Sequence, residues 1–277
     1  MGAICCAEGR KGEADTEGLS TSQLRKAVVH NTGIAKDDIF GDQMNDIDET
    51  QDDIDSIYKN RFEENLKINS TNLLDFYERL RLQESDYGKY DSKVNEEKLK
   101  ILFRTKGSEL CQDVPVIWSQ YMFEKGITVP MILKAIHNPE ERVKWDKDLR
   151  SAEVPRMENE NSMMVWHQQT KSTIKYILTR DFLEKKIKFT TGNKKYVYFS
   201  SLPDEILAAA DGESRAYTVF GFHVFERQED GRILMEVITQ TDYNVGVGAL
   251  AKIAQSAVVS SFPKTPKPHA IYIHMWK

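Results

Sequence analysis

The sequence predicts an α+β fold in which a curved antiparallel sheet wraps around a long C-terminal helix. Three observations lead to this prediction. Two short helical segments are followed by a run of alternating apolar segments, glycine-containing turns separate those segments, and a stripe of small apolar residues comes after them. Consecutive strands joined by tight turns pair antiparallel, and small side chains let a helix pack closely on the sheet.

Folded structure is expected to begin near Ser70. Ser70 or Thr71 would cap a first helix, because a hydroxyl can accept a hydrogen bond from the first free backbone amides. The apolar residues that recur there at helical spacing are Leu73, Leu74, Tyr77 and Leu80. Apolar and polar residues then alternate, which predicts strands over about 99–103 and 114–118.

A pair of helices follows these strands. Thr128 caps the first helix, and Asn138 caps the second with Pro139 at its first position, where the missing N–H costs nothing. The second helix carries Arg142 and Asp146, four residues apart and therefore on one face.

The rest of the chain predicts five strands and a helix. The strands are expected over about 162–169, 182–190, 195–201, 215–226 and 232–241, with turns at Gly192, Gly212 and Gly231. The final helical stripe consists of Val247, Leu250, Ala251, Ala254, Ala257 and Val258. A bent sheet around that helix leaves a hollow in which a ligand the size of a lipid fits.

Composition excludes several functional classes. The formal net charge of −5 over 277 residues argues against a nucleic-acid binder, which needs a basic surface. The three cysteines cannot form an internal disulfide framework, and they favour a reducing compartment. There is no apolar run of about 18 residues, so membrane contact is expected through a lipid anchor or surface insertion.

The first residues resemble an acylation signal. Removal of Met1 exposes Gly2 for myristoylation, and Cys5 and Cys6 stand beside it for palmitoylation, although the usual signal has Ser or Thr where Cys6 stands. One myristoyl chain binds a bilayer marginally, whereas two or three chains bind it stably. The expected location is therefore the cytoplasmic face of a membrane, and the alternative is an ordinary N-terminus with two unused thiols.

Residues 1–60 are expected to form a flexible extension ahead of a domain over 61–277. Between Asp42 and Asp55 the chain has seven acids and no base, a composition that cannot bury enough apolar area to fold. The extension is a candidate docking segment for a protein partner.

Four short motifs resemble the StAR-related lipid-transfer (START) family in order and spacing. They are Arg142-Val-Lys-Trp145-Asp146, Arg180-Asp181-Phe182, Tyr198-Phe-Ser200-Ser201-Leu-Pro203 and Gly248-Ala-Leu-Ala-Lys252. The resemblance covers roughly residues 70–262, although Ala251 replaces the usual Pro. It implies a helix-grip fold, also described as START/Bet v 1-like, with a tunnel for one sterol, phospholipid, ceramide or fatty-acid-like molecule. Most members bind or transfer lipid and are not enzymes.

The resemblance implies two ways to bind a headgroup. In phosphatidylcholine-binding relatives the matching Arg142 grips the phosphate and Asp146 orients it; the alternative is a surface ion pair. A choline cage would use Trp166 and Phe182. The remaining cage positions, where such relatives have Tyr, are occupied by Val219 and Gln240.

Sterol-binding relatives place an inward acid opposite an inward Arg, and the corresponding residues here are His167 and Lys186. Such a site suits an anionic headgroup or a hydroxyl, and the alternative is solvated surface. In the loop 202–214, Ile206 and Leu207 correspond to the family's lid; the alternative is a short helix packed on the rim of the sheet.

The sequence thus predicts a membrane-tethered lipid-binding or lipid-transfer protein that acts as a monomer, without a cofactor or metal and without nucleic acid as a partner. The alternative is a scaffold that keeps the START shape with a vestigial cavity in a membrane-attached assembly. An enzyme is not expected, since the chain has no Gly-x-Ser-x-Gly elbow, no closely spaced metal ligands and no phosphate-binding glycine loop.

Overall fold

The computed structural model describes residues 59–82, 88–146, 149–159, 162–170, 179–209 and 213–244, without the side chains of residues 155–170. The acylation residues Gly2, Cys5 and Cys6, the acidic extension and the C-terminal helix predicted over 247–258 therefore lie outside the described residues. The boundary near residue 60 stays a prediction.

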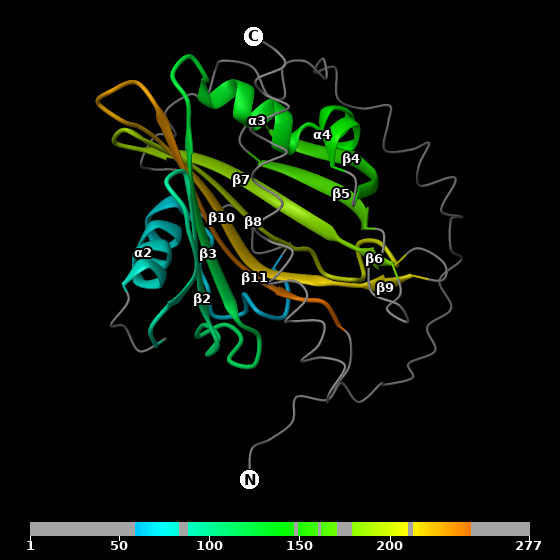
Figure 1. Ribbon diagram of the computed structural model, residues 1–277. Helices are drawn as coiled ribbons and strands as arrows, with labels where there is room; N and C mark the ends of the chain where they lie inside the picture. Colours follow the sequence, from blue (N-terminus) through cyan, green and yellow to red (C-terminus); the bar gives the residue numbers. More distant parts are fainter. Residues whose placement is uncertain are drawn as a thin grey trace, which may run out of the picture. The chain divides into compact units, whose positions relative to one another are not determined.

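The described residues form one sheet of 11 strands (Figure 1). Its order is β1-β2-β3-β11-β10-β8-β7-β5-β6-β9, with β4 paired to β5. All neighbours run antiparallel except the short pair β6–β9. The strands are β1 Asp91–Asn95, β2 Leu99–Arg104, β3 Val116–Phe123, β4 Leu149–Asn159, β5 Ser162–Thr170, β6 Arg180–Asp181, β7 Leu183–Thr191, β8 Lys194–Ser201, β9 Ser214–Arg215, β10 Tyr217–Arg227 and β11 Ile233–Asp242.

Most of the predicted strands are confirmed. The five segments expected after the helix pair correspond to β5, β7, β8, β10 and β11, and the two earlier ones to β2 and β3. Gly192 and Gly231 occupy turns with φ of 59° and 87°, the left-handed region that glycine adopts without strain. Strand β4 was not predicted, because its pairing with β5 shifts register four times and its sequence shows no clean alternation.

The helices have the expected ranges with one change of cap. Helices α3 (Val129–His137) and α4 (Pro139–Trp145) begin after Thr128 and Asn138, as predicted. Helix α2 (Ser70–Arg81) is capped by Asn69, not by Ser70 or Thr71. The Asn69 backbone is extended, and its Oδ1 accepts a hydrogen bond from the amide of Asn72 at 2.9 Å.

Helices α2 and α3 pack on opposite faces of the sheet. On one face, Phe76 of α2 contacts Phe220 and Phe222 of β10, with ring centroids 5.0 and 6.0 Å away. On the other face, the apolar side of α3 packs with Val197 of β8 and Phe225 of β10. Because the side chains of a strand alternate between the two faces of a sheet, β10 contributes residues to the core under α2 and to the core under α3. Figure 1 shows α2 beside β2 and β3, and α3 and α4 toward β7 and β5.

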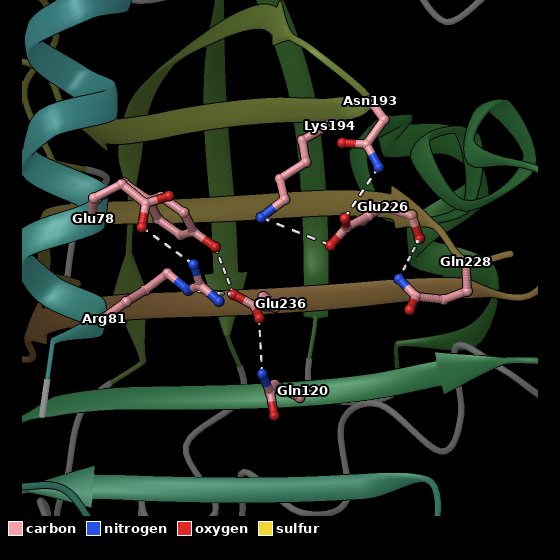
Figure 2. Close-up of polar contacts among 9 residues, drawn as sticks. Glu78, Arg81, Gln120, Asn193, Lys194, Glu226, Gln228 and Glu236 are labelled. Atoms are coloured by element: carbon pink, nitrogen blue, oxygen red, sulfur yellow. Dashed lines mark hydrogen bonds and ion pairs between the residues drawn. The ribbon is translucent and has the colours of Figure 1, made fainter.

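A charged network fixes the end of α2 to the sheet (Figure 2). The buried Glu236 of β11 accepts a hydrogen bond from Gln120 of β3 at 2.8 Å and pairs with Arg81 of α2 at 3.2 Å. Its second oxygen also accepts the Tyr77 hydroxyl, and burial beside this carboxylate raises the pKa of Tyr77. Arg81 contacts Glu78 as well, so the last turn of α2 cannot slide along the sheet without breaking several bonds.

The core begins before Ser70, earlier than the sequence predicted. Glu63 is fully buried, and its carboxylate accepts a hydrogen bond from Lys185 of β7 at 2.7 Å. Further donors to this carboxylate are the hydroxyls of Tyr198 and Ser200 and the backbone N–H of Asn60. Segment 59–68 is therefore part of the folded domain, and its distant partners left no periodic signal in the sequence.

Candidate functional site

The structure brings Arg142 and Asp146 together at the end of α4. Arg142 Nε donates to Asp146 Oδ2 at 3.2 Å, and the two side chains are 22% and 14% exposed. Trp145 Nε1 donates to the carbonyl of Ala135 at 2.9 Å, which ties α4 to α3. The pair is therefore largely buried and fixed in position, unlike the exposed surface ion pair that was the alternative interpretation.

Lys186 of β7 is a buried cation on the same face as α3. Its side chain is 3% exposed, so the alternative of a solvated surface lysine is wrong. The neighbouring Lys185 points to the opposite face and pairs with Glu63. Lys186 Nζ lies 3.1 Å from His137 Nδ1, and His137 Nε2 lies 3.0 Å from His223 Nδ1. Helix α3, β7 and β10 thus contribute one residue each to a chain of three polar side chains.

The chemistry of the groups fixes the direction of these hydrogen bonds. An ammonium only donates, so His137 Nδ1 accepts from Lys186 and the His137 proton lies on Nε2. His137 then donates to His223 Nδ1. The ring of Phe199 packs against this chain, with its centroid 5.9 Å from Lys186 Nζ and 4.8 Å from the His223 ring. Gly221 makes room for that ring, since a Cβ there would lie 2.1 Å from Phe199.

Burial favours the neutral forms of the Lys186 and His137 side chains. It lowers the pKa of Lys186 to about 8, with Arg142 adding repulsion and Glu184 opposing it. Burial also lowers the pKa of His137 well below its usual value, and the charge of Lys186 adds to the shift. At neutral pH, Lys186 is therefore mostly charged and His137 is neutral.

His137 and His223 were not predicted from the sequence. His137 is the last residue of a helix with an otherwise apolar buried side, and His223 alternates with apolar residues in β10. Each looks like an isolated polar residue until the fold brings α3 onto the sheet. The sequence did contain one usable signal. Alternate residues of a strand point to the same face, so His223 lies on the same face of β10 as Gly221 and Phe225, which is the face covered by α3.

His167 and Lys186 belong to the adjacent strands β5 and β7 but are not register partners. Met163 of β5 pairs with Lys186, and Trp166 pairs with Leu183. The side chains of Trp166 and His167 lie outside the described residues, so their roles stay predictions.

Of the positions considered for a choline cage, the structure describes the side chains of Phe182, Val219 and Gln240. Phe182 is buried with its ring centroid 6.1 Å from that of Tyr243. Val219 belongs to the core on the α2 face. The Gln240 amide is buried and engages the 107–114 loop: it accepts from Ser108 Oγ and donates to two backbone carbonyls. Gln240 therefore has a structural role.

The residues predicted as a lid, Ile206 and Leu207, are half-buried against Leu183 and Leu202. The buried guanidinium of Arg215 donates to the Leu207 carbonyl at 3.0 Å and to Asp181 Oδ1 at 2.8 Å. The alternative of a short helix packed on the rim is not found over the described residues 202–209, which form turns that pack on the sheet. Opening at a membrane stays a prediction.

The described residues contain neither a membrane-spanning helix nor a cluster of metal ligands. None of the helices described there is long and apolar enough to cross a bilayer. Nor do three or more His, Cys, Asp or Glu side chains of those residues gather as metal ligands.

Comparisons with solved structures decide the fold. The chain superposes on human STARD10 with a TM-score of 0.62 at 12% identity, covering 74% of this chain and 79% of that one. For human StAR-related lipid transfer protein 5 the TM-score is 0.63 at 12% identity, covering 74% and 93%. This chain has the START-domain fold.

The START fold extends to a bacterial protein. A StAR-related lipid transfer protein fragment from Xanthomonas axonopodis gives a TM-score of 0.53 at 15% identity, covering 67% of this chain and 98% of that fragment. No family model and no curated protein matches the sequence. The helix-grip arrangement predicted from four short motifs is thus confirmed by shape, at identities that leave the ligand open.

Proposed function

We propose that the protein binds one lipid molecule in an internal hydrophobic tunnel of its START fold and carries it as a membrane-tethered monomer. The observation that supports this most is the buried charged cluster of Arg142, Asp146 and Lys186 on the α3 face of a START fold. Burying charges is costly, and a ligand headgroup that pairs with them offsets that cost. Binding of this kind needs no catalytic group, metal or cofactor.

We expect the Arg142→Ala variant to take up phospholipid from vesicles about tenfold less than the unchanged chain, because a charge-assisted hydrogen bond to phosphate is lost. Stability should fall by about 1–3 kcal/mol, because the largely buried Asp146 carboxylate loses a charged partner.

Lys144→Ala is the matched control for Arg142→Ala. It removes a positive charge from the same helix at a side chain that is 56% exposed. Uptake measured by mass spectrometry of the full chain should be unaffected by this control. If Arg142→Ala takes up phospholipid as the unchanged chain does, Arg142 is not a phosphate ligand.

We further propose that acyl chains on Gly2, Cys5 and Cys6 hold the protein at the cytoplasmic face of a cellular membrane. Gly2→Ala removes the myristoylation site, and we expect it to shift the protein from the membrane fraction to the soluble fraction. A variant with Cys5→Ser and Cys6→Ser should bind reversibly, because a single myristoyl chain gives an association constant of only about 10⁴ M⁻¹. Full membrane association of Gly2→Ala would contradict the anchor. The acidic extension that follows is proposed as a docking segment for a protein partner.

One observation favours the alternative of a scaffold with a vestigial cavity. Gln240, at a position that the family resemblance assigns to headgroup binding, is used to fix the 107–114 loop. A scaffold would bind no lipid under any condition, which separates it from a carrier experimentally.

A further inference from the structure

Part of the α3 face stays open in the middle of the sheet. Phe199 of β8, His223 of β10 and Thr239 of β11 are half-buried, although these three strands are central in the sheet order. They are neighbours, because Gly221 pairs with both Phe199 and Thr239, and His223 is the next residue of β10 on that face. The adjacent residues on the opposite face are completely buried: Tyr198, Phe222 and Ile238. This open patch of Phe199, His223 and Thr239 therefore has room for an apolar ligand that packs on the Phe199 ring.

Lys186 borders the open patch. It is the register partner of Phe199, and its Nζ lies 5.9 Å from the centroid of the Phe199 ring. Its side chain is 3% exposed, and within the described part of the chain its Nζ makes one hydrogen bond, to His137 Nδ1 at 3.1 Å. A buried amine beside an apolar surface is the usual setting of a nucleophilic lysine, because desolvation favours the neutral form with a free electron pair.

A path for the proton of this amine leads back to solvent. His137 Nδ1 accepts from Lys186 Nζ, and His137 Nε2 lies 3.0 Å from His223 Nδ1. His223 is half-buried and therefore reaches solvent. When His137 takes a proton at Nδ1 it can release another from Nε2 to His223, so it does not have to stay charged. The two histidines thus connect a buried amine to solvent without any opening of the fold.

We propose that Lys186 is a covalent attachment site for a long-chain lipid aldehyde whose hydrocarbon chain packs on the open patch. The Nζ electron pair of the neutral amine bonds to the carbonyl carbon, and one N–H proton passes to the carbonyl oxygen. The resulting carbinolamine loses its hydroxyl and the remaining N–H proton as water, which leaves a C=N bond and needs no oxidant or reductant. His137 and His223 are positioning residues that hold the amine and relay its proton. This inference rests on the proposed lipid-binding function and names a chemical class of cargo.

The rate of attachment has a defined pH dependence. Only the neutral amine reacts, and burial lowers the pKa of Lys186 to about 8, whereas an exposed lysine has a pKa of about 10.4. We therefore expect the rate to rise about tenfold per pH unit below about pH 8 and to level off above it. The titratable groups that face Lys186 or His137 from α3, α4, β7 and β10 are His137, Arg142, Asp146, Glu184, Lys188 and His223.

The test incubates the full chain with phosphatidylcholine vesicles that contain hexadecanal. Sodium borohydride then reduces any imine to a stable amine, and mass analysis of peptides locates the adduct. At pH 8 we expect about one adduct per chain, on Lys186. Lys186→Met should reduce the adduct about tenfold or more, and so should Lys186→Arg, which keeps the positive charge. Lys93→Met, the same change at an exposed position of β1, should leave the adduct on Lys186 unaltered.

His137→Asn tests the relay of the proton. The asparagine side chain keeps an acceptor on the Nδ1 side but lacks the second ring nitrogen that faces His223. We expect the initial rate of attachment to fall about tenfold or more, while the final amount of adduct stays the same. An unaltered rate, or a lower final amount, would overturn the role given to His137.

Each contrary outcome has a separate meaning. If folded Lys186→Met carries as much adduct as the natural chain, or if exposed lysines are modified as fast as Lys186, attachment at Lys186 is refuted. An equal rate with butanal and with hexadecanal overturns recognition of the hydrocarbon chain. Hexadecanal that binds but is never trapped by borohydride overturns the covalent step and leaves lipid binding intact. If neither hexadecanal nor phosphatidylcholine binds, the proposed function itself fails.

Discussion

Glu63→Ala is expected to destabilise the protein by about 3–5 kcal/mol, because it leaves the buried ammonium of Lys185 without its carboxylate. The Glu63 carboxylate is fully buried and accepts hydrogen bonds from the side chains of Lys185, Tyr198 and Ser200. Its loss therefore also leaves two hydroxyls unsatisfied, and burial beside Glu63 already raises the pKa of Tyr198. Unfolding in urea followed by circular dichroism measures the change.

Two further variants make the Glu63 prediction specific. Glu64→Ala, one residue along and exposed, should change the free energy of unfolding by about 0.5 kcal/mol or less. Adding Lys185→Met to Glu63→Ala should recover part of the loss, since no uncompensated charge then remains. If Glu63→Ala is as stable as Glu64→Ala, segment 59–68 is not part of the folded domain.

Asp181→Ala, in the short strand β6 that precedes β7, is expected to produce a loss of similar size, about 3–5 kcal/mol. Asp181 is fully buried and accepts from Arg215 Nε at 2.8 Å, in the one parallel strand pair of the described sheet. The same guanidinium donates to the Leu207 carbonyl, so Asp181 indirectly fixes the loop that holds Ile206 and Leu207. We expect faster amide hydrogen exchange over residues 202–209 together with the lower stability.

The control for Asp181→Ala removes the outer partner of Arg215. Asp204 lies 3.3 Å from Arg215 Nη1, and its side chain is 53% exposed. Asp204→Asn should therefore cost about 1 kcal/mol or less. Unaltered hydrogen exchange of the loop in Asp181→Ala would show that Arg215 does not control it.

Local patterns were sufficient for the elements and their order. Strands β8 and β10 are rich in aromatic and β-branched residues, and glycines mark the turns beside them. Helices α3 and α4 carry capping residues and Pro139, so the ranges of these elements could be read directly. Strand β7 was also predicted, but its burial was not. Solvated surface was the alternative interpretation of Lys186, whereas each lysine from Lys185 to Lys188 is buried by groups from elsewhere in the chain.

The candidate site could be predicted only in part, because most of its contacts join residues distant in sequence. Arg142 and Asp146 meet because they are four apart on one helix. Lys186 was selected through the family resemblance, but its contact with His137 spans 49 residues and that of His137 with His223 spans 86. A single sequence contains no signal for such pairs. The register of β5 on β7 was equally inaccessible, since a slip of one residue reverses every side chain.

The most direct test of lipid binding is native mass spectrometry of the full chain purified from cells, with the same sample measured under denaturing conditions. Acyl chains on the N-terminus are covalent and remain in both spectra, whereas a lipid in the fold is lost on denaturation. We predict one additional lipid mass per chain in the native spectrum and one kind of lipid in the extract at the same stoichiometry. A native mass equal to the denatured mass, unchanged after incubation with mixed vesicles, would contradict lipid binding and favour the scaffold.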